Sequence, residues 1–232
     1  MDENCNIKFY EKVKGRGFSP TYVAEVGVWH PNTSNVYSYI QSGTKTMLVE
    51  PDPKSILLIK KKWGEKSNVQ LHEAAICDFN GEIELCQRDS STFVSSLPSS
   101  PALVNDNCNI QESESFMAKA LKFSEIDDGT IELISIDTEG SEWFVIKNMI
   151  SRPVIISIET HGGIYVNPYI KELKAWMQDN SYELWFKDKS DSVYVLKNKN
   201  TITLLDRLYL FGMNLLITLK VTRKKIKKII VQ

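Results

Sequence analysis

Acidic residues follow an apolar run in segment 132–142, and this pattern is the one in the chain best suited to chemistry. The segment reads Glu-Leu-Ile-Ser-Ile-Asp-Thr-Glu-Gly-Ser-Glu, so Asp137, Glu139 and Glu142 come where the apolar run ends. Such a run predicts a buried strand over 131–137 that passes directly into a helix. Buried carboxylates need hydrogen bonds, a cation or a metal to offset their desolvation, and open α/β folds bind ligands at this edge of the sheet. Asp137 is therefore a candidate functional residue.

Helix electrostatics offers a simpler explanation of the same acids, because negative side chains stabilise the N-terminus of a helix. This explanation accounts well for Glu142, at the expected start of a helix over 142–150, and poorly for Asp137. We therefore favour a functional role for Asp137 and interpret Glu142 as a helix-start residue.

A second apolar run, 154–159, ends in Glu159, and His161 follows two residues later. Histidine titrates near neutral pH, as a general base requires, so His161 is the candidate base among the three histidines. A histidine in a loop can also be a solvated or capping residue, and that alternative stays open.

If strands 131–137 and 154–159 are neighbours in the sheet, Asp137 and Glu159 share one site. Two carboxylates could bind a divalent metal that holds the vicinal hydroxyls of a sugar and lowers the pKa of the acceptor. The alternative is that one carboxylate orients His161 and that no metal is bound. We favour this alternative, since hard metals generally take more oxygen ligands than these two residues offer.

A glycine and an acid on two earlier strands predict a nucleoside-binding site. Gly27 follows an expected strand over 22–26, and Glu50 ends the next one, 46–50. Glycine lets a ligand approach the main chain, and an acid one strand away can accept hydrogen bonds from two ribose hydroxyls. Neither the GxGxxG fingerprint of nicotinamide cofactors nor a phosphate loop is present. S-adenosylmethionine, which has a nucleoside and no phosphates, is therefore the candidate cofactor.

Strands and helices alternate along the chain, which predicts an α/β sandwich with a mostly parallel sheet and right-handed crossovers. Residues 88–115 are rich in Ser, Asn and Pro and predict a lid or substrate loop. A hairpin of 182–186 with 192–196 should close one edge of the sheet. The other strands are expected at 69–76, 82–86 and 121–126, and the other helices at 32–42, 53–63 and 168–179.

The last part of the chain differs from the rest in charge. The net charge is -1, but the last thirteen residues contain six basic side chains, so residues 1–219 carry -7. This acidic body argues against nucleic-acid binding. Residues 203–231 predict a basic amphipathic helix, which would dock on an anionic membrane surface or on a protein partner. We therefore divide the chain into a catalytic domain, 1–200, and a docking helix, 201–232.

The four cysteines show no metal-ligand spacing, and free thiols in a reducing cytosol are the simplest account. We therefore expect a cytoplasmic protein, with peripheral attachment to the inner face of the cell membrane as an option through the terminal helix.

Over roughly residues 20–198, the chain resembles the FkbM-type S-adenosylmethionine-dependent methyltransferase family. The resemblance is carried by Glu-Val-Gly-Val-Trp-His-Pro at 25–31, Val-Glu-Pro-Asp-Pro at 49–53 and Ile-Asp-Thr-Glu-Gly-Ser-Glu at 136–142. Family members often have Asp-Val-Gly-Ala-Asn in the first loop, where this chain has Glu25 and Val28-Trp29. The resemblance implies a Rossmann-like methyltransferase fold and methyl transfer to a hydroxyl, as of a sugar in a cell-surface glycan or lipid-linked precursor.

The resemblance and the chemistry of methyl transfer together assign roles to single residues. His161, Asp137 and Glu159 would be catalytic, and Trp29 and His30 would contact the substrate. The first loop would bind the methionine end of the cofactor through Glu25, Gly27 and Val28. Glu50 would bind the ribose, and Ala75 and Asp78 would lie near the adenine. The alternatives are methylation of a small natural product or a lipid, or a scaffold without catalysis.

Overall fold

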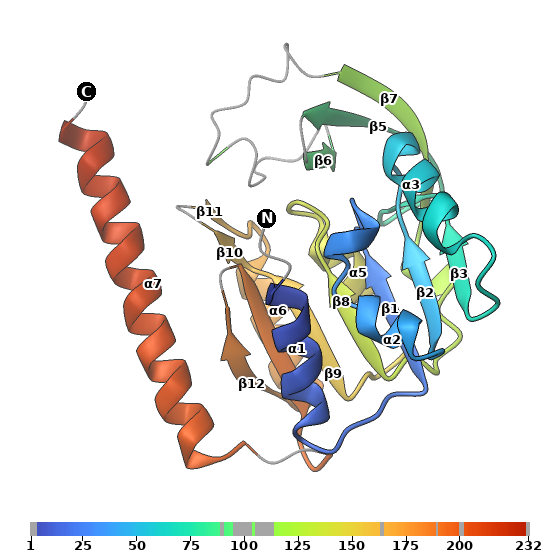
Figure 1. Cartoon of the computed structure of the whole chain (residues 1–232). Coiled ribbons are helices and arrows are strands. Elements are labelled where there is room, and N and C mark those ends of the chain that lie inside the picture. Colours follow the sequence, from blue (N-terminus) through green and yellow to red (C-terminus); the bar gives the residue numbers. More distant parts are fainter. Residues whose placement is uncertain are drawn as a thin grey trace.

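The computed structural model describes residues 4–88, 91–94, 104, 114–162, 165–188, 190–199 and 202–230, with side chains for 9–86, 104, 115–162, 165–188, 190–199 and 202–223. Its main sheet has the order β12-β13-β9-β8-β1-β2-β3 (Figure 1). The strands are β1 (Tyr22–Val26), β2 (Lys45–Val49), β3 (Val69–His72), β8 (Leu133–Ile136), β9 (Ile155–Glu159), β12 (Tyr182–Lys187) and β13 (Asp191–Leu196). All neighbours are parallel except β13, which is antiparallel to both β9 and β12. The expected Rossmann-like α/β fold with an antiparallel edge hairpin is confirmed.

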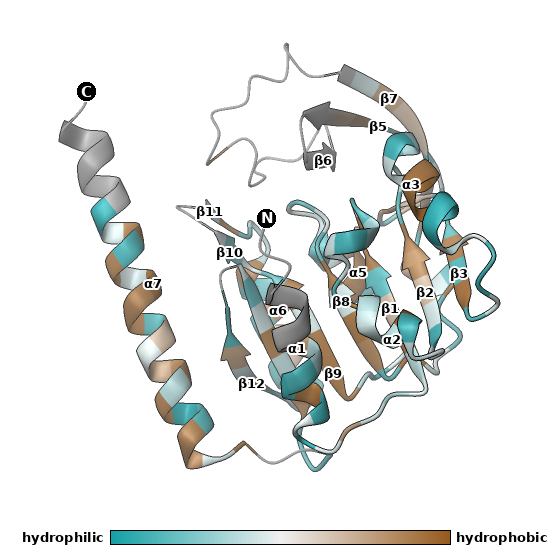
Figure 2. Cartoon of the chain, in the orientation of Figure 1, coloured by the Kyte–Doolittle hydropathy of each residue, from teal (hydrophilic) through white to brown (hydrophobic). Residues whose placement is uncertain are grey.

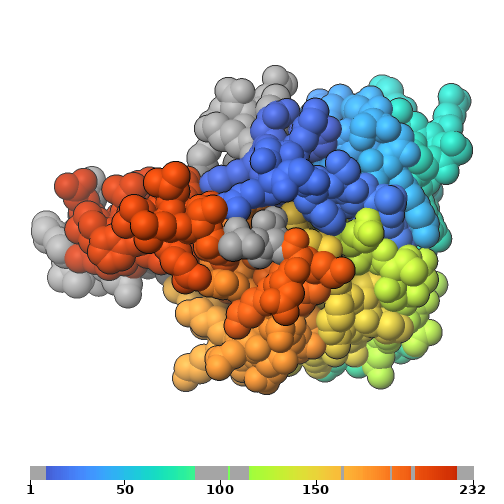
Figure 3. Space-filling view, turned by 90° about the horizontal axis from the view of Figure 1, so that it is seen from below, coloured from blue at the N-terminus to red at the C-terminus, as the bar shows by residue number. Residues whose placement is uncertain are grey.

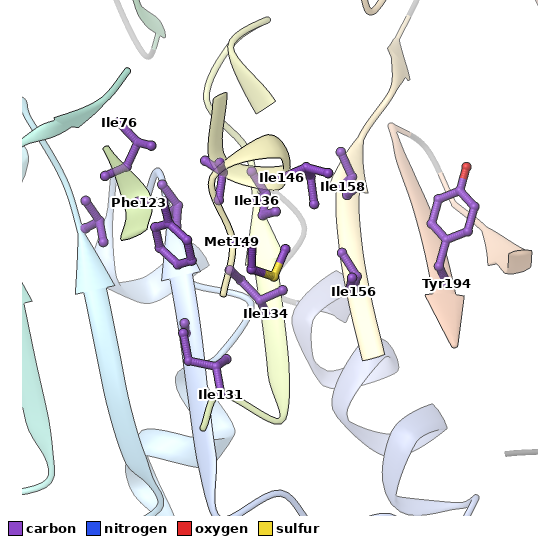
Figure 4. Packing of buried hydrophobic residues seen from close by; sticks show 14 of the residues in the cluster. Ile76, Phe123, Ile131, Ile134, Ile136, Ile146, Met149, Ile156, Ile158 and Tyr194 are labelled. Carbon is purple, nitrogen blue, oxygen red and sulfur yellow. The ribbon is translucent and has the colours of Figure 1, made fainter. Parts of the chain in front are cut away.

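Side chains alternate between the two faces of this sheet, as strand geometry requires. Val23, Leu133 and Ile155 pack against the helices of one face, and their sequence neighbours pack against those of the other. Figure 4 shows part of the core on the other face of the sheet, with Ile134 and Ile136 of β8 beside Ile146 and Met149. The first face is covered by α1 (Asn4–Lys14), α2 (Tyr37–Gln41) and α3 (Pro53–Trp63), and the second by α5 (Glu142–Lys147) and α6 (Ile170–Asp179).

The strand order reverses between β1 and β8. From β1 the chain continues to β2 and β3 on one side, and β8 and β9 lie on the other. In open α/β sheets the crevice at such a reversal, at the carboxyl ends of the strands, is where ligands bind. The loops after β1, β2, β8 and β9 all open onto this edge, so the fold brings the candidate residues together.

A four-stranded sheet, order β4-β7-β5-β6, stands above the carboxyl edge (Figure 1). The expected strand 69–76 is divided between the two sheets, because Ala75 pairs with Ala120 instead of with β2. The expected strand 121–126 was wrong, since only Leu121 is a strand residue and a 3-10 turn, Phe123–Glu125, follows. The strands of the second sheet are β4 (Ala75–Ile76), β5 (Gly81–Arg88), β6 (Ser91–Val94) and β7 (Glu114–Leu121).

Two further expectations need correction. The expected helix 32–42 is broken into a 3-10 turn (Pro31–Thr33) and α2, because Ser34 is extended and hydrogen-bonds to the side chain of β1 residue Glu25. In the expected loop 88–115, residues 91–94 form β6, and most of the remainder lies outside the described residues. Helix α1 was not predicted from the sequence.

The terminal helix α7 (Leu204–Ile230) has 27 residues, so it is about 40 Å long. Its first turn is fixed to the body, since Asp206 forms an ion pair with Arg16 and accepts a hydrogen bond from Trp185 Nε1 at 3.1 Å. The helix then runs along one side of the body and projects from it (Figures 1 and 3). Among the described residues, no helix combines the length and apolarity needed to cross a bilayer.

Candidate active site

Gly27 brings the loops after β1 and β8 into contact. Its φ is +83°, and a Cβ at this position would overlap the carbonyl oxygen of Asp137. Asp137 N in turn donates to the carbonyl of Val26 at 2.9 Å. Trp29, two residues on, has a φ of +52°, which is uncommon for a residue with a side chain and is found often at functional sites. The backbone at the strand-order reversal is therefore tightly constrained.

The carboxylate of Glu50 fixes the conformation of this first loop. Oε2 accepts hydrogen bonds from the backbone N–H groups of Val28 and Trp29, both at 2.8 Å, and Oε1 accepts one from Asp52 N at 3.0 Å. Burial raises the pKa of Glu50, against the effect of these donors. A carboxylate offers about four acceptor positions, so the three bonds leave one for a ligand hydroxyl.

Glu25 is directed toward the segment that leads to α2. Its oxygens accept hydrogen bonds from Ser34 Oγ at 2.5 Å and from Asn35 N at 2.7 Å. Burial, more than the nearby charge of Glu50, raises the pKa of Glu25 to about 8. The side chain therefore connects β1 to the break between the 3-10 turn and α2, directly behind the first loop.

The other candidate ligand-contacting residues lie around this loop and the second sheet. Ala75 is buried in β4, and Asp78 is exposed and pairs with Lys147 at 3.1 Å. His30 Nδ1 accepts a hydrogen bond from Asn32 N, which caps the 3-10 turn, and the half-buried Trp29 lies with its ring 6.0 Å from that of His30. Trp29 and His30 are half-buried and Asp78 is exposed, so these three side chains have surface available to a ligand, whereas Ala75 is buried.

Three carboxylates meet at the ends of β8 and β9. Ile136 pairs with Ile158, so the expectation that the two strands are neighbours is confirmed. One oxygen each from Asp137, Glu142 and Glu159 lies within 4.8 Å of the others. The reason for preferring a site without a metal was that two acids offered too few oxygen ligands, and the fold supplies a third.

Glu142 is the member of this cluster that sequence reasoning assigned only to the start of a helix. It does begin α5, and its Oε1 accepts hydrogen bonds from Thr138 N at 2.9 Å and Gly140 N at 3.0 Å. The side chain is completely buried, and Asn167 Nδ2 donates to its Oε2. Asn167 is 25 residues away in sequence, so no local spacing reveals this contact.

Burial raises the pKa of all three carboxyl groups, and the charges of neighbouring acids raise the pKa values of Asp137 and Glu159 further. Asp137 keeps some accessible surface, whereas Glu142 and Glu159 are buried. Oε2 of Glu159 is enclosed and has no hydrogen-bond partner in the described part of the chain. Such a cluster can accept a proton, share one or bind a cation.

His161 lies in the short hairpin of β10 (His161–Gly162) and β11 (Tyr165–Val166) that follows β9. Its Nδ1 shares a hydrogen bond with Thr160 Oγ1 at 2.9 Å, and its buried Nε2 has no partner among the described residues. Burial and the charge of Lys187 lower the pKa of the imidazole. The groups that orient the ring are thus the hydroxyl of Thr160 and the backbone of Asp188, and neither Asp137 nor Glu159 forms a hydrogen bond with it in the described structure.

A mostly parallel sheet with its order reversed beside a glycine loop defines a Rossmann-like α/β enzyme fold. The model of the family described as "Methyltransferase FkbM domain" matches residues 22–184. The chain therefore belongs to the FkbM-type S-adenosylmethionine-dependent methyltransferase family, and it is a methyltransferase.

Solved methyltransferase structures match the chain at low sequence identity. They include the ribosomal protein L11 methylase of Lactobacillus delbrueckii subsp. bulgaricus (10% identity, 85% of this chain and 81% of that one, TM-score 0.44). A second is an S-adenosylhomocysteine-bound methyltransferase of Podospora anserina (12%, 83% and 78%, 0.42). A third is the precorrin-6y C5,15-methyltransferase of Geobacter metallireducens (11%, 83% and 85%, 0.39). No curated protein matches the chain, and likeness at this level carries no information about the acceptor.

Proposed function

We propose that this protein transfers the methyl group of S-adenosylmethionine to a hydroxyl of a sugar, in a cell-surface glycan or its lipid-linked precursor. Methyl transfer follows from the family. The observation that supports a hydroxyl acceptor is the convergence of the carboxylates of Asp137, Glu142 and Glu159 beside the reversal of strand order. Carboxylates can orient a hydroxyl and take its proton, and a neutral hydroxyl needs both in order to attack the methyl group.

The residues around the crevice fit the cofactor. Gly27 allows the tight bend that holds the first loop against the loop after β8, where the methionine end would lie, and the remaining acceptor position of Glu50 suits a ribose hydroxyl. The exposed Asp78 and the β4 residue Ala75 would border the adenine, and Glu25 holds the loop from behind through Ser34 and Asn35. When bound, S-adenosylmethionine supplies an electrophilic methyl group on sulfur, and the handling of the acceptor proton falls to the protein.

Two kinds of group are available for that proton. His161 offers Nε2 without a hydrogen-bond partner, held in place through Nδ1 by Thr160. We assign His161 as the general base and Asp137 and Glu159 as the groups that position the acceptor hydroxyl. Trp29 and His30, on the loop after β1, would also contact the acceptor.

Radiolabelled S-adenosylmethionine tests this function directly. The purified chain is incubated with cell extract, and the label is followed in polymeric glycan, lipid-linked glycan, free lipid and small-molecule fractions. Label in a glycan fraction that is released as an O-methyl sugar on acid hydrolysis supports the proposal. Label found only in free lipid or in small natural products would show that the acceptor is a lipid or a small molecule and not a glycan sugar. A cofactor titration that detects no binding would favour a scaffold without catalysis.

The apolar face of α7 supports a location at an anionic membrane surface, on the inner face of the cell membrane of a cytoplasmic enzyme. Side chains that are 51–73% exposed recur at intervals of three or four residues along one side: Leu204, Leu208, Phe211, Leu215 and Leu219. Figure 2 shows apolar and polar residues interleaved along the helix. Six basic residues follow between positions 220 and 228, which complements anionic lipid.

Charge favours a lipid surface over a second helix. A seam of apolar residues with steps of three, seven and four, at Leu205, Leu208, Leu215 and Leu219, would also suit a helical partner, so the apolar spacing does not separate the two occupants. The six basic residues between positions 220 and 228 complement anionic lipid headgroups. We therefore favour membrane docking over a helical protein partner.

A further inference from the structure

We propose that Asp137, Glu142 and Glu159 bind one hard divalent cation of the Mg²⁺ or Mn²⁺ class, which holds two vicinal hydroxyls of the acceptor. The cation site stands on the described geometry alone. Its role toward the acceptor rests on the proposed function.

The spacing of the three oxygens suits such an ion. They lie within 4.8 Å of one another. Oxygens on opposite sides of Mg²⁺ are about 4.2 Å apart, since each lies about 2.1 Å from the metal, and Ca²⁺ allows slightly longer separations. Small side-chain rotations therefore close the site around the ion. Three protein oxygens leave three of six positions for water or for acceptor hydroxyls.

The cluster lacks a cation of its own. Among the described residues, none of the three carboxylates forms an ion pair with a lysine, arginine or histidine. Glu142 is 0% exposed and Glu159 is 9% exposed, and Oε2 of Glu159 is enclosed without a hydrogen-bond partner. An unpartnered carboxylate oxygen at the burial of Glu159 is costly, and a bound divalent ion would remove that cost.

Tyr165 is a second and independent indication of a ligand. Its hydroxyl is buried without a partner in the described structure. Its hairpin begins directly after β9, with Tyr165 paired to Gly162. The hairpin therefore carries Tyr165 close in sequence and strand pairing to Glu159, and burial and then the charges of Glu142 and Glu159 raise the pKa of this phenol. A buried hydroxyl normally finds a partner, and water or hydroxyl on the ion provides one.

Asn167 orients the cluster from behind. Its Nδ2 donates to Glu142 Oε2, and its own N–H is bonded to Thr160 O at 3.0 Å, so it connects α5 to the end of β9. Groups in this position hold ligand carboxylates in place and tune metal affinity. The structure therefore contains three candidate ligands, an orienting amide and a buried hydroxyl on the hairpin that follows Glu159.

Manganese binding tests the proposal without reference to activity. The full-length protein is titrated with Mn²⁺, and free Mn²⁺ is measured from its electron paramagnetic resonance signal. We expect one ion per chain, more than tenfold weaker binding in Asp137→Asn and in Glu159→Gln, and about tenfold weaker binding in Tyr165→Phe. The surface variant Glu172→Gln, on α6, should bind as the wild type does. Glu142→Gln would also disturb the start of α5, which the side chain of Glu142 holds.

The outcomes separate the two proposals. No bound Mn²⁺, or unchanged affinity in both ligand variants with intact circular dichroism, would overturn the cation site. If Mn²⁺ binds as expected and no hydroxyl is ever methylated, the proposed function is wrong and the site stands. If methylation continues at full rate after treatment with EDTA, the ion has no role toward the acceptor.

Discussion

The carbonyl oxygen of Asp137 occupies the space that a side chain on Gly27 would need. These residues are 110 positions apart in sequence and lie at the ends of neighbouring strands, β1 and β8. The contact joins the loop after β1 to the loop after β8 where the strand order reverses, so the loop proposed for the cofactor lies next to the carboxylate cluster. A backbone shift at Gly27 should therefore affect both the proposed cofactor site and Asp137.

Replacing Gly27 by alanine should therefore do more than strain the backbone. Gly43 has the same φ, +83°, but a Cβ there meets nothing within 4 Å, so Gly43→Ala is a matched control. The φ penalty alone should cost each variant about 1–3 kcal/mol. We expect Gly27→Ala to lose further stability and more than tenfold in S-adenosylmethionine affinity, measured by urea unfolding and calorimetry. Equal losses in the two variants would show that the overlap with Asp137 is relieved without consequence.

Glu50→Gln should disorganise the first loop. The carboxylate accepts three backbone hydrogen bonds, and the amide nitrogen of Gln would face an N–H group whichever way it turned. The loss of one charge-assisted bond costs about 1.5–3 kcal/mol, so cofactor affinity should fall by at least tenfold. The exposed Glu73→Gln serves as the control, and calorimetric titration of both proteins is the measurement. Wild-type affinity in Glu50→Gln would remove this residue from the cofactor site.

Glu25 should make the folded protein less stable as the pH rises through neutrality. Burial raises the pKa of its carboxyl from an ordinary 4.5 to about 8 in the folded protein, so the folded state binds the extra proton between these limits. Stability from this group is complete below pH 4.5 and is lost as pH rises to about 8, by up to about 1.4 kcal/mol per unit. Glu25→Gln, which resembles the protonated form, should flatten this slope in urea unfolding at pH 6–9. Parallel curves for the two proteins would contradict the assignment.

His161→Ala should separate catalysis from binding. A general base contributes about 10²–10⁴-fold, so kcat should fall by that order while the Kd for S-adenosylmethionine stays unchanged. Thr160→Val removes the hydrogen bond to Nδ1 and should lower kcat less, because the base remains but is poorly oriented. Single-turnover rates and cofactor titrations measure the two effects. Full turnover in His161→Ala would show that His161 is not the general base and would leave the carboxylates as the groups that accept the proton.

The face of α7 can be tested with two double variants of equal charge. Leu208→Glu with Leu215→Glu interrupts the apolar stripe, whereas Asn214→Glu with Thr218→Glu places the same charge at exposed polar positions. In sedimentation with vesicles containing anionic lipid, we expect the first pair to abolish binding and the second to weaken it. Binding should also weaken with salt. If the wild type ignores vesicles and forms dimers that depend on Leu208, the helix binds protein instead.

The sequence by itself determined the alternation of strands and helices, the glycine bend at Gly27, and the acids at the ends of three strands. These features are local, because hydrophobic period, turn residues and strand-end charges act within a few positions. Helix 53–63 was predicted to the residue for this reason, since Asp52 caps it and Pro53 begins it.

Only the tertiary structure decided what those residues contact. Glu142 lies with Asp137 and Glu159 in one cluster, where Asn167 donates a hydrogen bond to it. Ser34 lies outside the helix expected for it and hydrogen-bonds to Glu25, and Ala75 lies in the second sheet instead of the main one. Each outcome depends on a partner whose approach is set by the packing of whole elements. Local propensities differ by fractions of a kcal/mol, and a buried carboxylate that needs its hydrogen bonds outweighs them.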